Sequence, residues 1–440
     1  MTTPTQTMTS RRQIGFWTAV ALVMGNMIGS GIFLLPASLA LFGGIGLAAW
    51  VVSAAGSIML ALVFARLSRL DPAQGGPYAF TRRAFGDLPG FLVAWGYWIS
   101  VWCGNAAIAM ACVGSLDPFF PTLVHTPVSA ALLATAMVWL LTGVNVLGIR
   151  EAGHVQTVTT VLKIVPLVVI GIGGILLSNP SHFAVVHVEG HTTAGSLAAA
   201  AALTFWAFGG LESATIPAGA IQNPERTIPR ATIIGTVLCA VIYIVSTVGV
   251  MGVIDPKTLA AAPAPFADAA QVIVGGWARK AVAIGAAIAC FGALNGWILI
   301  AGQVPMAIAR DGLFPKIFGR VSSRGVPAHG LVISSVLTTV LLATNASDGL
   351  VTVFTFIILL GTLNALVPYA FSSLAGLVIE RQGPGPSHAT RATTVIALLA
   401  FAYALWAIGG SGAEVVYWGF LLLLAGLPVY VWVVRQRAPA

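Results

Sequence analysis

Long runs of apolar residues, separated by short polar segments, make up most of the 440-residue chain. A run of about 20 apolar residues is long enough to cross the ~30 Å hydrocarbon core of a bilayer as an α-helix. Twelve runs reach this length and predict an all-α polytopic membrane protein with twelve transmembrane helices. The runs cover residues 15–40, 45–67, 88–115, 127–146, 155–177, 196–221, 229–254, 278–308, 329–345, 350–378, 392–410 and 413–434.

The positions of the basic residues predict the orientation of these helices. When the N-terminus is placed in the cytoplasm, all but four of the 21 Lys and Arg residues fall on the cytoplasmic side. The exceptions are Lys257, Arg279 and Lys280 in outer loops and Lys163 within a helix. This asymmetry follows the positive-inside rule and agrees with an even number of spans. We therefore expect a multi-pass protein of the bacterial inner (plasma) membrane, with cytoplasmic tails at residues 1–14 and 435–440.

The composition of the chain excludes several classes of protein. Hydrophobic residues account for 58% of the chain and charged residues for only 8%, whereas a soluble domain has about 25% charged residues. A soluble enzyme is therefore excluded. Because the basic residues follow the membrane topology, they do not indicate a nucleic-acid partner. The sequence has no metal-ligand spacing and predicts no cofactor, so membrane lipid and a small solute are the expected partners.

Two glycine-rich segments interrupt the first and the sixth apolar run. They are Gly25-Asn-Met-Ile-Gly-Ser-Gly31 and Trp206-Ala-Phe-Gly-Gly-Leu-Glu212. Close packing of neighbouring helices is one explanation for such glycines. The segments, however, lie in the first helices of two five-helix halves, residues 15–177 and 196–378, which precede two further helices at 392–434. Because five is odd, the halves have opposite topology, and interrupted helices at matching positions of an inverted repeat are typical of a secondary transporter's substrate site.

The backbone groups released at these interruptions predict the chemistry of the ligand. Lipid cannot hydrogen-bond free N–H and C=O groups, so they must face a cavity or a ligand. Helix N-termini offer N–H donors to a carboxylate, and free carbonyls accept hydrogen bonds from an ammonium group, so a zwitterionic amino acid suits the site. An intramembrane enzyme or a transporter-like sensor is disfavoured, because no paired aspartates, no His-Glu-x-x-His motif and no stretch long enough for a signalling domain are present.

Five motifs carry a resemblance to a known family. They are Gly25-Asn-Met-Ile-Gly-Ser-Gly-Ile-Phe-Leu-Leu-Pro36, Gly75-Gly-Pro-Tyr-Ala-Phe80, Phe205-Trp-Ala-Phe-Gly-Gly-Leu-Glu-Ser-Ala214, Asn223-Pro-Glu-Arg-Thr-Ile-Pro229 and Asp311-Gly-Leu-Phe-Pro315. In sequence and order they resemble the amino acid–polyamine–organocation (APC) superfamily, in particular its basic amino acid/polyamine antiporters, and most of all the bacterial arginine/agmatine antiporters. The resemblance implies a LeuT-type fold that works by alternating access, and it raises the option of a homodimer.

The resemblance also implies roles for particular residues. The substrate site would be formed by Asn26, Met27, Ser30, Gly31, Asn105, Ile108, Trp206, Gly209, Trp297 and Gly361. Gating and proton coupling would involve Tyr97, Trp206, Glu212, Tyr369 and Lys163. The face of a tryptophan attracts a cation by about 0.5–2 kcal/mol, and it also stacks on apolar side chains, so tryptophans alone do not fix the charge of the substrate.

Two charged residues, Glu212 and Lys163, lie at membrane depth, away from the ends of their predicted spans, where such groups usually mark function. Glu212 would pass a proton, or alternatively stay protonated in a structural hydrogen bond. Lys163 departs from the arginine/agmatine antiporters and resembles the lysine that fills a sodium site in other permeases, which implies sodium independence. The alternative for Lys163 is snorkelling to the membrane surface. Ile108 and Gly361 also depart from these antiporters, in which the corresponding residues resemble Met and Ser.

The function predicted from these residues is sodium-independent amino-acid transport. The preferred prediction is exchange of a basic amino acid (arginine, ornithine or lysine) for a related amino acid or its decarboxylated amine. Lys163 and the reduced polarity at Ile108 and Gly361 leave a second prediction open, a proton-coupled importer of neutral amino acids.

Overall fold

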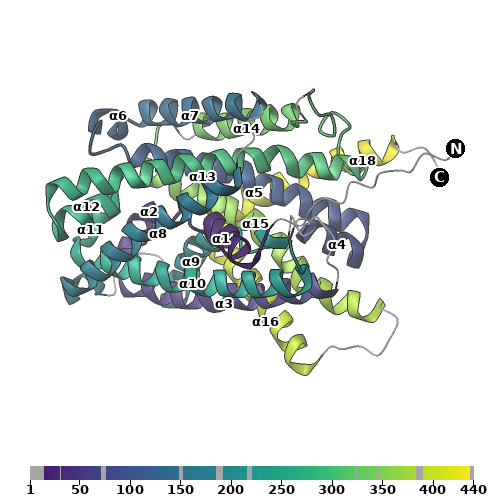
Figure 1. The fold of residues 1–440 in the computed structure, drawn as a ribbon, viewed down its shortest axis with the longest axis horizontal. Coiled ribbons are helices and arrows are strands. Elements are labelled where there is room, and N and C mark those ends of the chain that lie inside the picture. Colours follow the sequence, from purple (N-terminus) through teal and green to yellow (C-terminus); the bar gives the residue numbers. More distant parts are fainter. Residues whose placement is uncertain are drawn as a thin grey trace.

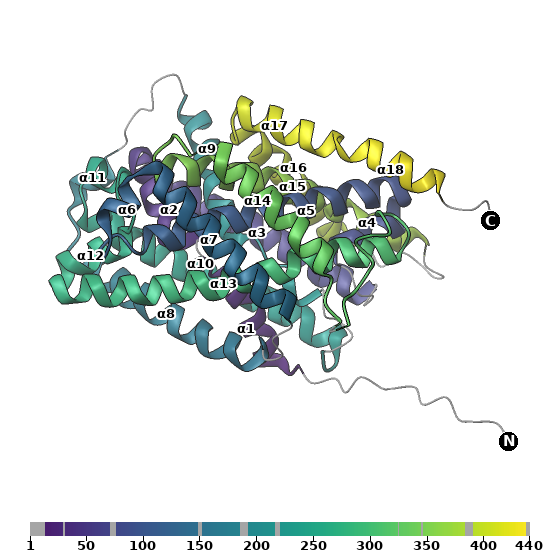
Figure 2. The same cartoon turned by 90° about the horizontal axis from the view of Figure 1, so that it is seen from above.

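The computed structural model describes residues 14–29, 31–70, 76–147, 152–184, 192–215, 221–323, 325–344, 346–382 and 390–436. Ser30, most of the expected N-terminal tail and residues 437–440 of the expected C-terminal tail lie outside the described residues. The described chain is an elongated helical bundle, with most of the long helices running along its length (Figure 1, Figure 2). Its isolated β-bridge joins Ile14 to Ile221.

The helices follow the apolar runs of the sequence. The α-helices are α1 (Phe16–Met27), α2 (Gly31–Leu39), α3 (Gly44–Leu70), α4 (Pro77–Phe85), α5 (Asp87–Gly114), α6 (Pro121–His125), α7 (Pro127–Leu147), α8 (Ala152–Leu176), α9 (Thr193–Phe205), α10 (Pro224–Val253), α11 (Pro256–Ala260), α12 (Pro265–Ile273), α13 (Gly276–Arg310), α14 (Ala328–Thr344), α15 (Leu350–Gln382), α16 (Arg391–Gly410), α17 (Ala413–Leu424) and α18 (Gly426–Arg435). Short 3₁₀ helices are η1 (Ala40–Phe42), η2 (Pro180–Phe183), η3 (Trp206–Phe208) and η4 (Ser213–Thr215).

The described residues form a polytopic membrane architecture. Nine helical segments are long and apolar enough to cross a bilayer, and the bent pair formed by α1 and residues 31–42 would be a tenth. The described apolar part of α8, Lys163–Leu176, and α14 are apolar but shorter. Each of the twelve predicted runs therefore contains a helix, while the count of twelve crossings stays a prediction.

The last apolar run, 413–434, is divided in the structure. Helix α17 ends at Leu424 and α18 begins at Gly426, with Ala425 between them. Pro428 explains this division, because its ring lacks an N–H donor and clashes with the carbonyl of the residue four positions earlier, here Leu424. The two helices still count together as one segment long enough to span the membrane.

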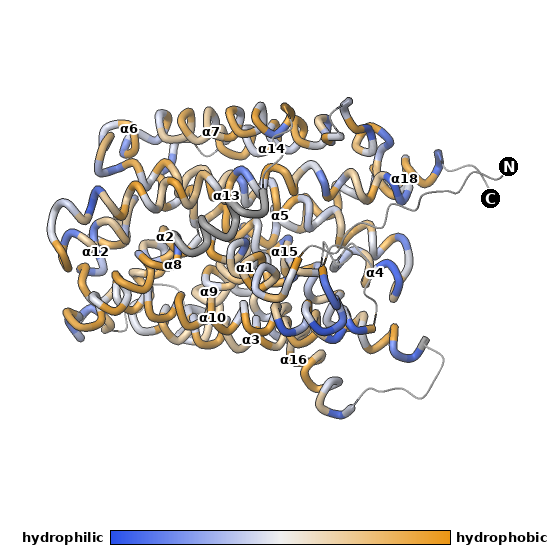
Figure 3. The backbone as a smooth tube through the Cα atoms, viewed as in Figure 1, coloured by the Kyte–Doolittle hydropathy of each residue, from blue (hydrophilic) through white to orange (hydrophobic). Residues whose placement is uncertain are grey.

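Helix α5 lies at the centre of the bundle and α17–α18 at its edge. The whole apolar window of α5 is buried inside the protein, and α5 packs against α13, α15, α7 and α4. On α17 and α18, by contrast, Tyr417, Trp418 and Trp432 are about half exposed, at 59%, 48% and 52%. Hydrophobic residues occupy most of the length of the bundle, and hydrophilic residues gather toward its two ends, near α12 and α4 (Figure 3). The exposed apolar surface is therefore the surface that meets lipid.

Charged groups cluster where α5, α12 and α13 meet at one end. Arg279 donates from Nη2 to Asp117 Oδ2 at 2.6 Å and from Nε to Asp268 Oδ1 at 2.9 Å. His125 Nε2 lies 3.0 Å from the other oxygen of Asp117. Burial raises the pKa of Asp268, and the hydrogen bond from Arg279 opposes that rise. Arg279 therefore compensates two carboxylates, and the Asp117 side chain is only 6% exposed.

We expect the substitution Arg279→Gln to destabilise the protein, because it leaves Asp117 buried without its cationic partner. The loss of charge-assisted hydrogen bonds should lower the free energy of unfolding by about 2 kcal/mol. A thermal melt in detergent, followed by tryptophan fluorescence, measures the effect. The neighbouring substitution Lys280→Gln removes an exposed charge and should leave the melting temperature unchanged. Equal melting temperatures for the two variants would contradict the prediction.

Candidate functional site

The first helix break lies between α1 and α2. Helix α1 ends at Met27, and the axis turns by 41° before the chain continues as helix from Gly31. The Ile28 N–H still reaches Met24 O at 2.7 Å, whereas the Gly29 N–H turns to Met27 O at 2.8 Å. The first turn of α2 therefore starts inside the bundle, and the N–H groups at a helix start have no partner within the helix.

The second break follows α9. Helix α9 ends at Phe205, the chain tightens into η3, and Gly210 adopts φ 100° before η4 begins at Ser213. A side chain at Gly210 would be strained, because its φ is positive and its Cβ would lie 3.2 Å from Asn26 Cβ. The glycine therefore lets this break approach the end of α1 closely.

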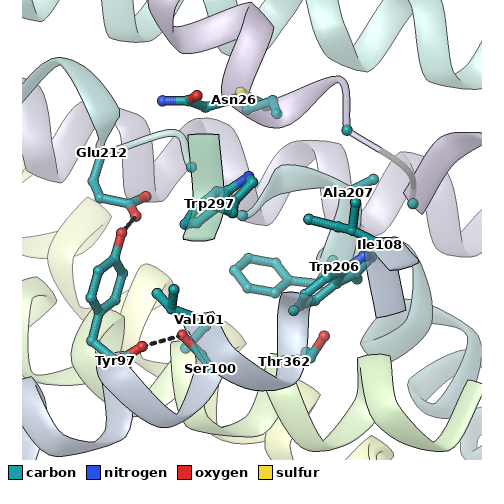
Figure 4. Close-up of a pocket in the computed structure, with 18 of the residues that line it drawn as sticks. Asn26, Tyr97, Ser100, Val101, Ile108, Trp206, Ala207, Glu212, Trp297 and Thr362 are labelled. Carbon is teal, nitrogen blue, oxygen red and sulfur yellow. Dashed lines mark hydrogen bonds between the residues drawn. The ribbon is translucent and has the colours of Figure 1, made fainter. Parts of the chain in front are cut away.

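A cavity lies between the two breaks. It is narrow, with a volume of about 60 Å³, and its wall is formed by residues of α1, α2, α5, α9–η3, α13 and α15. Figure 4 shows Trp297 in the middle of the view, Glu212 and Tyr97 on one side, and Trp206, Ile108 and Thr362 on the other. This volume is well below the ~300–1,000 Å³ typical of ligand sites.

Glu212 is fully buried at one side of the cavity and is held by two tyrosines. Tyr97 on α5 donates from its hydroxyl to Glu212 Oε1 at 2.7 Å, and Tyr369 on α15 donates to Oε2. Tyr97 is 8% exposed and Tyr369 is 1% exposed. The carboxyl group thus links the second helix break to α5 and α15, the helices across the cavity from it.

Most of the predicted site residues come together in this cavity. Those that line it are Asn26, Met27, Gly31, Tyr97, Ile108, Trp206, Gly209, Glu212, Trp297 and Tyr369. Three others do not line it. Asn105 is buried on α5 at 2% exposure, and Gly361 lies behind Trp206, where an added Cβ would be 2.9 Å from Trp206 Cζ3. Lys163 is 3% exposed on α8, which packs against α1 and α13.

Several lining residues were missed by the sequence analysis. They are Gly29, Ser100, Val101, Gly104, Phe205, Ala207, Gly210, Thr362 and Ala365. A signal for some of them was present, because residues three or four apart share one face of a helix. Positions 97, 100, 101, 104 and 108 form one face of α5, and positions 362, 365 and 369 one face of α15. No group of three or more His, Cys, Asp and Glu residues that could hold a metal occurs in the part of the chain described.

Comparison with known proteins decides the family. The sequence profile of the amino acid permease family matches residues 14–433. The chain belongs to the amino acid permease family. This confirms the APC resemblance, including its group of basic amino acid/polyamine antiporters, and it makes the protein a transporter rather than an enzyme.

Relatives of this permease include antiporters and an amine transporter. The Escherichia coli (strain K12) cadaverine/lysine antiporter is 39% identical over 76% of this chain and 75% of its own length. The Bacillus subtilis putative arginine/ornithine antiporter is 33% identical over 97% and 98%. The putrescine transporter PotE of Escherichia coli (strain K12) is 31% identical over 93% of each chain.

A solved structure supports the fold of the permease. The crystal structure of the Eremococcus coleocola manganese transporter superposes with a TM-score of 0.62, covering 95% of this chain and 94% of that chain at 13% identity. At that identity the likeness concerns the fold alone. The two chains therefore share the arrangement of their helices.

We expect the double substitution Tyr97→Phe, Tyr369→Phe to destabilise the permease. It removes both tyrosine donors of a fully buried carboxyl group, and hydrogen bonds to such groups contribute about 1.5–3 kcal/mol each. The melting temperature should therefore fall by several degrees relative to the substitution Tyr417→Phe, which changes a tyrosine that is 59% exposed. A double variant as stable as the Tyr417 variant would show that the two hydroxyl groups do not hold Glu212.

Proposed function

We propose that this permease is a sodium-independent antiporter that exchanges a basic amino acid (arginine, ornithine or lysine) for a related amino acid or its decarboxylated amine. One observation carries the proposal: two helix breaks face a shared cavity that also contains two tryptophans and a buried carboxyl group. The names of its relatives, which include antiporters for cadaverine and lysine and for arginine and ornithine, agree with it.

The backbone at the breaks would bind the part common to all amino acids. The N-terminus of α2, at Gly31 on the cavity wall, provides N–H donors and the positive end of a helix dipole for an α-carboxylate. The α-ammonium group would be bound by backbone carbonyls at the second break, near Trp206 and Gly209, both of which line the cavity. The first break would thus offer donors to the carboxylate of a zwitterion, and the second break would offer acceptors to its ammonium group.

The side chain of the substrate would lie against aromatic rings. Trp206 and Trp297 line the cavity, and an indole face attracts an ammonium or guanidinium group. Glu212 is the carboxylic acid among the described lining residues. Because its hydroxyl partners come from α5 and α15, a change in its protonation would alter contacts across the cavity, which supports a role in gating.

The twelve crossings and the inverted repeat belong to the same proposal. The rocking bundle of the first, second, sixth and seventh crossings would consist of α1–α2, α3, α9–η4 and α10. In support, α3 packs against α9 and α10, and α1 packs against α10. The rest of the protein would be built around α5, against which both α13 and α15 pack. The cavity between these two groups of helices would open to alternate sides.

A buried lysine supports the sodium independence of the proposed exchange. Lys163 is 3% exposed and lies on α8, which packs against α1. An ammonium group fixed there would take the place of a bound cation beside the first helix break. The same lysine, together with the apolar Ile108 on the cavity wall, favours a second candidate, proton-coupled uptake of neutral amino acids.

We expect counterflow in proteoliposomes to distinguish these candidates. Radiolabelled lysine should enter vesicles loaded with unlabelled arginine, ornithine, lysine or putrescine, without sodium and without a pH gradient. The substitution Trp297→Leu should reduce this uptake by roughly tenfold or more, because it removes an aromatic ring from the cavity wall. The substitution Trp418→Leu, on the half-exposed surface of α17, should leave it unchanged.

The opposite pattern would favour the importer. Uptake of alanine or leucine into empty vesicles that requires an inward proton gradient, with no stimulation by internal basic amino acids, would rule out exchange. Equal loss of lysine counterflow in the Trp297 and Trp418 variants would show that the cavity is not the substrate site.

A further inference from the structure

One polar side chain on the cavity wall has an unused hydrogen-bonding group. Thr362 on α15 is 1% exposed and lines the cavity, and its Oγ1 has no hydrogen-bond partner among the described residues. Figure 4 shows its hydroxyl group below the ring of Trp206. A buried hydroxyl group without a partner has lost its hydrogen bonds to water, and a ligand that bonds to it compensates that loss.

Among the described residues, the other hydroxyl groups on the cavity wall already have partners. Tyr97 and Tyr369 donate to Glu212. Ser100 Oγ donates to the Tyr97 carbonyl at 2.7 Å, and Figure 4 shows it on the Tyr97 side. Of the described hydroxyl groups on the wall, the one on Thr362, near Trp206, is therefore without a partner.

Three glycines hold the Trp206 ring beside Thr362. An added Cβ would lie 2.7 Å from Trp206 Cδ1 at Gly31, 2.9 Å from Cη2 at Gly104 and 2.9 Å from Cζ3 at Gly361. These glycines come from α2, α5 and α15, so the edge of the indole touches backbone on three sides. Distances below 3.0 Å leave no room for a side chain at these positions, and the ring is thereby kept next to the Thr362 hydroxyl group.

An aromatic face beside a single oxygen acceptor suits one type of cation. An ammonium group is compact and can donate to one oxygen while its charge faces an aromatic ring. A guanidinium group is a planar fork of five donors that binds best to paired acceptors. At a single hydroxyl group next to the apolar Ile108, most N–H donors of a guanidinium group would lose their hydrogen bonds to water without gaining a protein partner.

From this geometry we infer that Thr362 is a specificity-determining residue that selects substrates with a terminal primary ammonium group, such as lysine, ornithine and their diamines, over guanidinium compounds. The inference rests on the proposed function, because it concerns the side-chain end of the same cavity. It adds a residue, and a preference within the basic substrates, that the proposed function leaves undefined.

The test compares binding to purified, full-length variants in detergent by calorimetry. The ligands are lysine, cadaverine, arginine, agmatine and norleucine, which has the chain length of lysine without its ammonium group. The substitution Thr362→Val should weaken lysine and cadaverine binding by roughly tenfold or more and leave norleucine binding unchanged. The substitution Thr362→Ser, which keeps the hydroxyl group, should retain the preference for lysine over arginine.

The control is the substitution Thr247→Val. It changes an equally buried threonine of α10, whose hydroxyl group also lacks a partner in the described chain, and this variant should bind the ligands like the wild type.

The outcomes separate this inference from the proposed function. If the wild type binds none of the four basic ligands, the proposed function fails. If the wild type binds them but Thr362→Val weakens lysine and norleucine equally, or changes neither, then the proposed function stands and the assignment of Thr362 is overturned. A wild type that prefers arginine over lysine would likewise overturn it. Melting temperatures of all variants identify any that fail to fold.

Discussion

The hydrocarbon core of a bilayer cannot hydrogen-bond a peptide group, and the structure of this permease is organised around two places where helices stop inside the bundle. Backbone groups at membrane depth must bond within a helix, to another part of the protein or to something in a cavity. Between Met27 and Gly31, and again between Phe205 and Ser213, the regular helix is lost. Both places face one cavity, so the same constraint explains why the breaks lie side by side and why a polar ligand would be bound there.

The cavity differs in chemistry from one side to the other. On one side, the buried carboxyl group of Glu212 is held by Tyr97 and Tyr369, which connects a helix break to α5 and α15. On the other side, Trp206 is held by glycines of three helices beside the hydroxyl group of Thr362. The side with Glu212 connects the two groups of helices that alternating access would separate. The side with Trp206 would contact the side chain of the substrate, which is its variable part. Under the proposed function, gating and selectivity would therefore use different residues of the same cavity.

Much of the fold could be predicted from the sequence because membrane helices depend on local composition. The apolar runs gave helix positions to within a few residues, for example 88–115 against Asp87–Gly114 for α5. The break at Ala425 was not predicted, although Pro428 carried its signal. The family resemblance predicted ten residues of the cavity wall, because motifs such as Gly25–Gly31 contain the helix breaks.

The residues that sequence reasoning missed depend on packing between helices. Gly104 and Gly361 are ordinary small residues in an apolar run, and only the position of Trp206 gives them a role. Thr362 is one of many threonines in the spans, and its significance comes from a hydroxyl group left without a partner at the cavity. Likewise, Asn105 was expected in the cavity but does not line it, although its neighbours on the same helix, Val101 and Ile108, do.

A structure of the permease with bound lysine, determined by electron cryo-microscopy in lipid nanodiscs, tests the account most directly. We expect the amino acid to occupy the cavity, with its carboxylate at the N-terminus of α2 near Gly31, its α-ammonium group near Gly209 and its side chain beside Trp206. A ligand bound elsewhere, or a continuous helix through residues 27–31 with lipid beside it, would contradict the account.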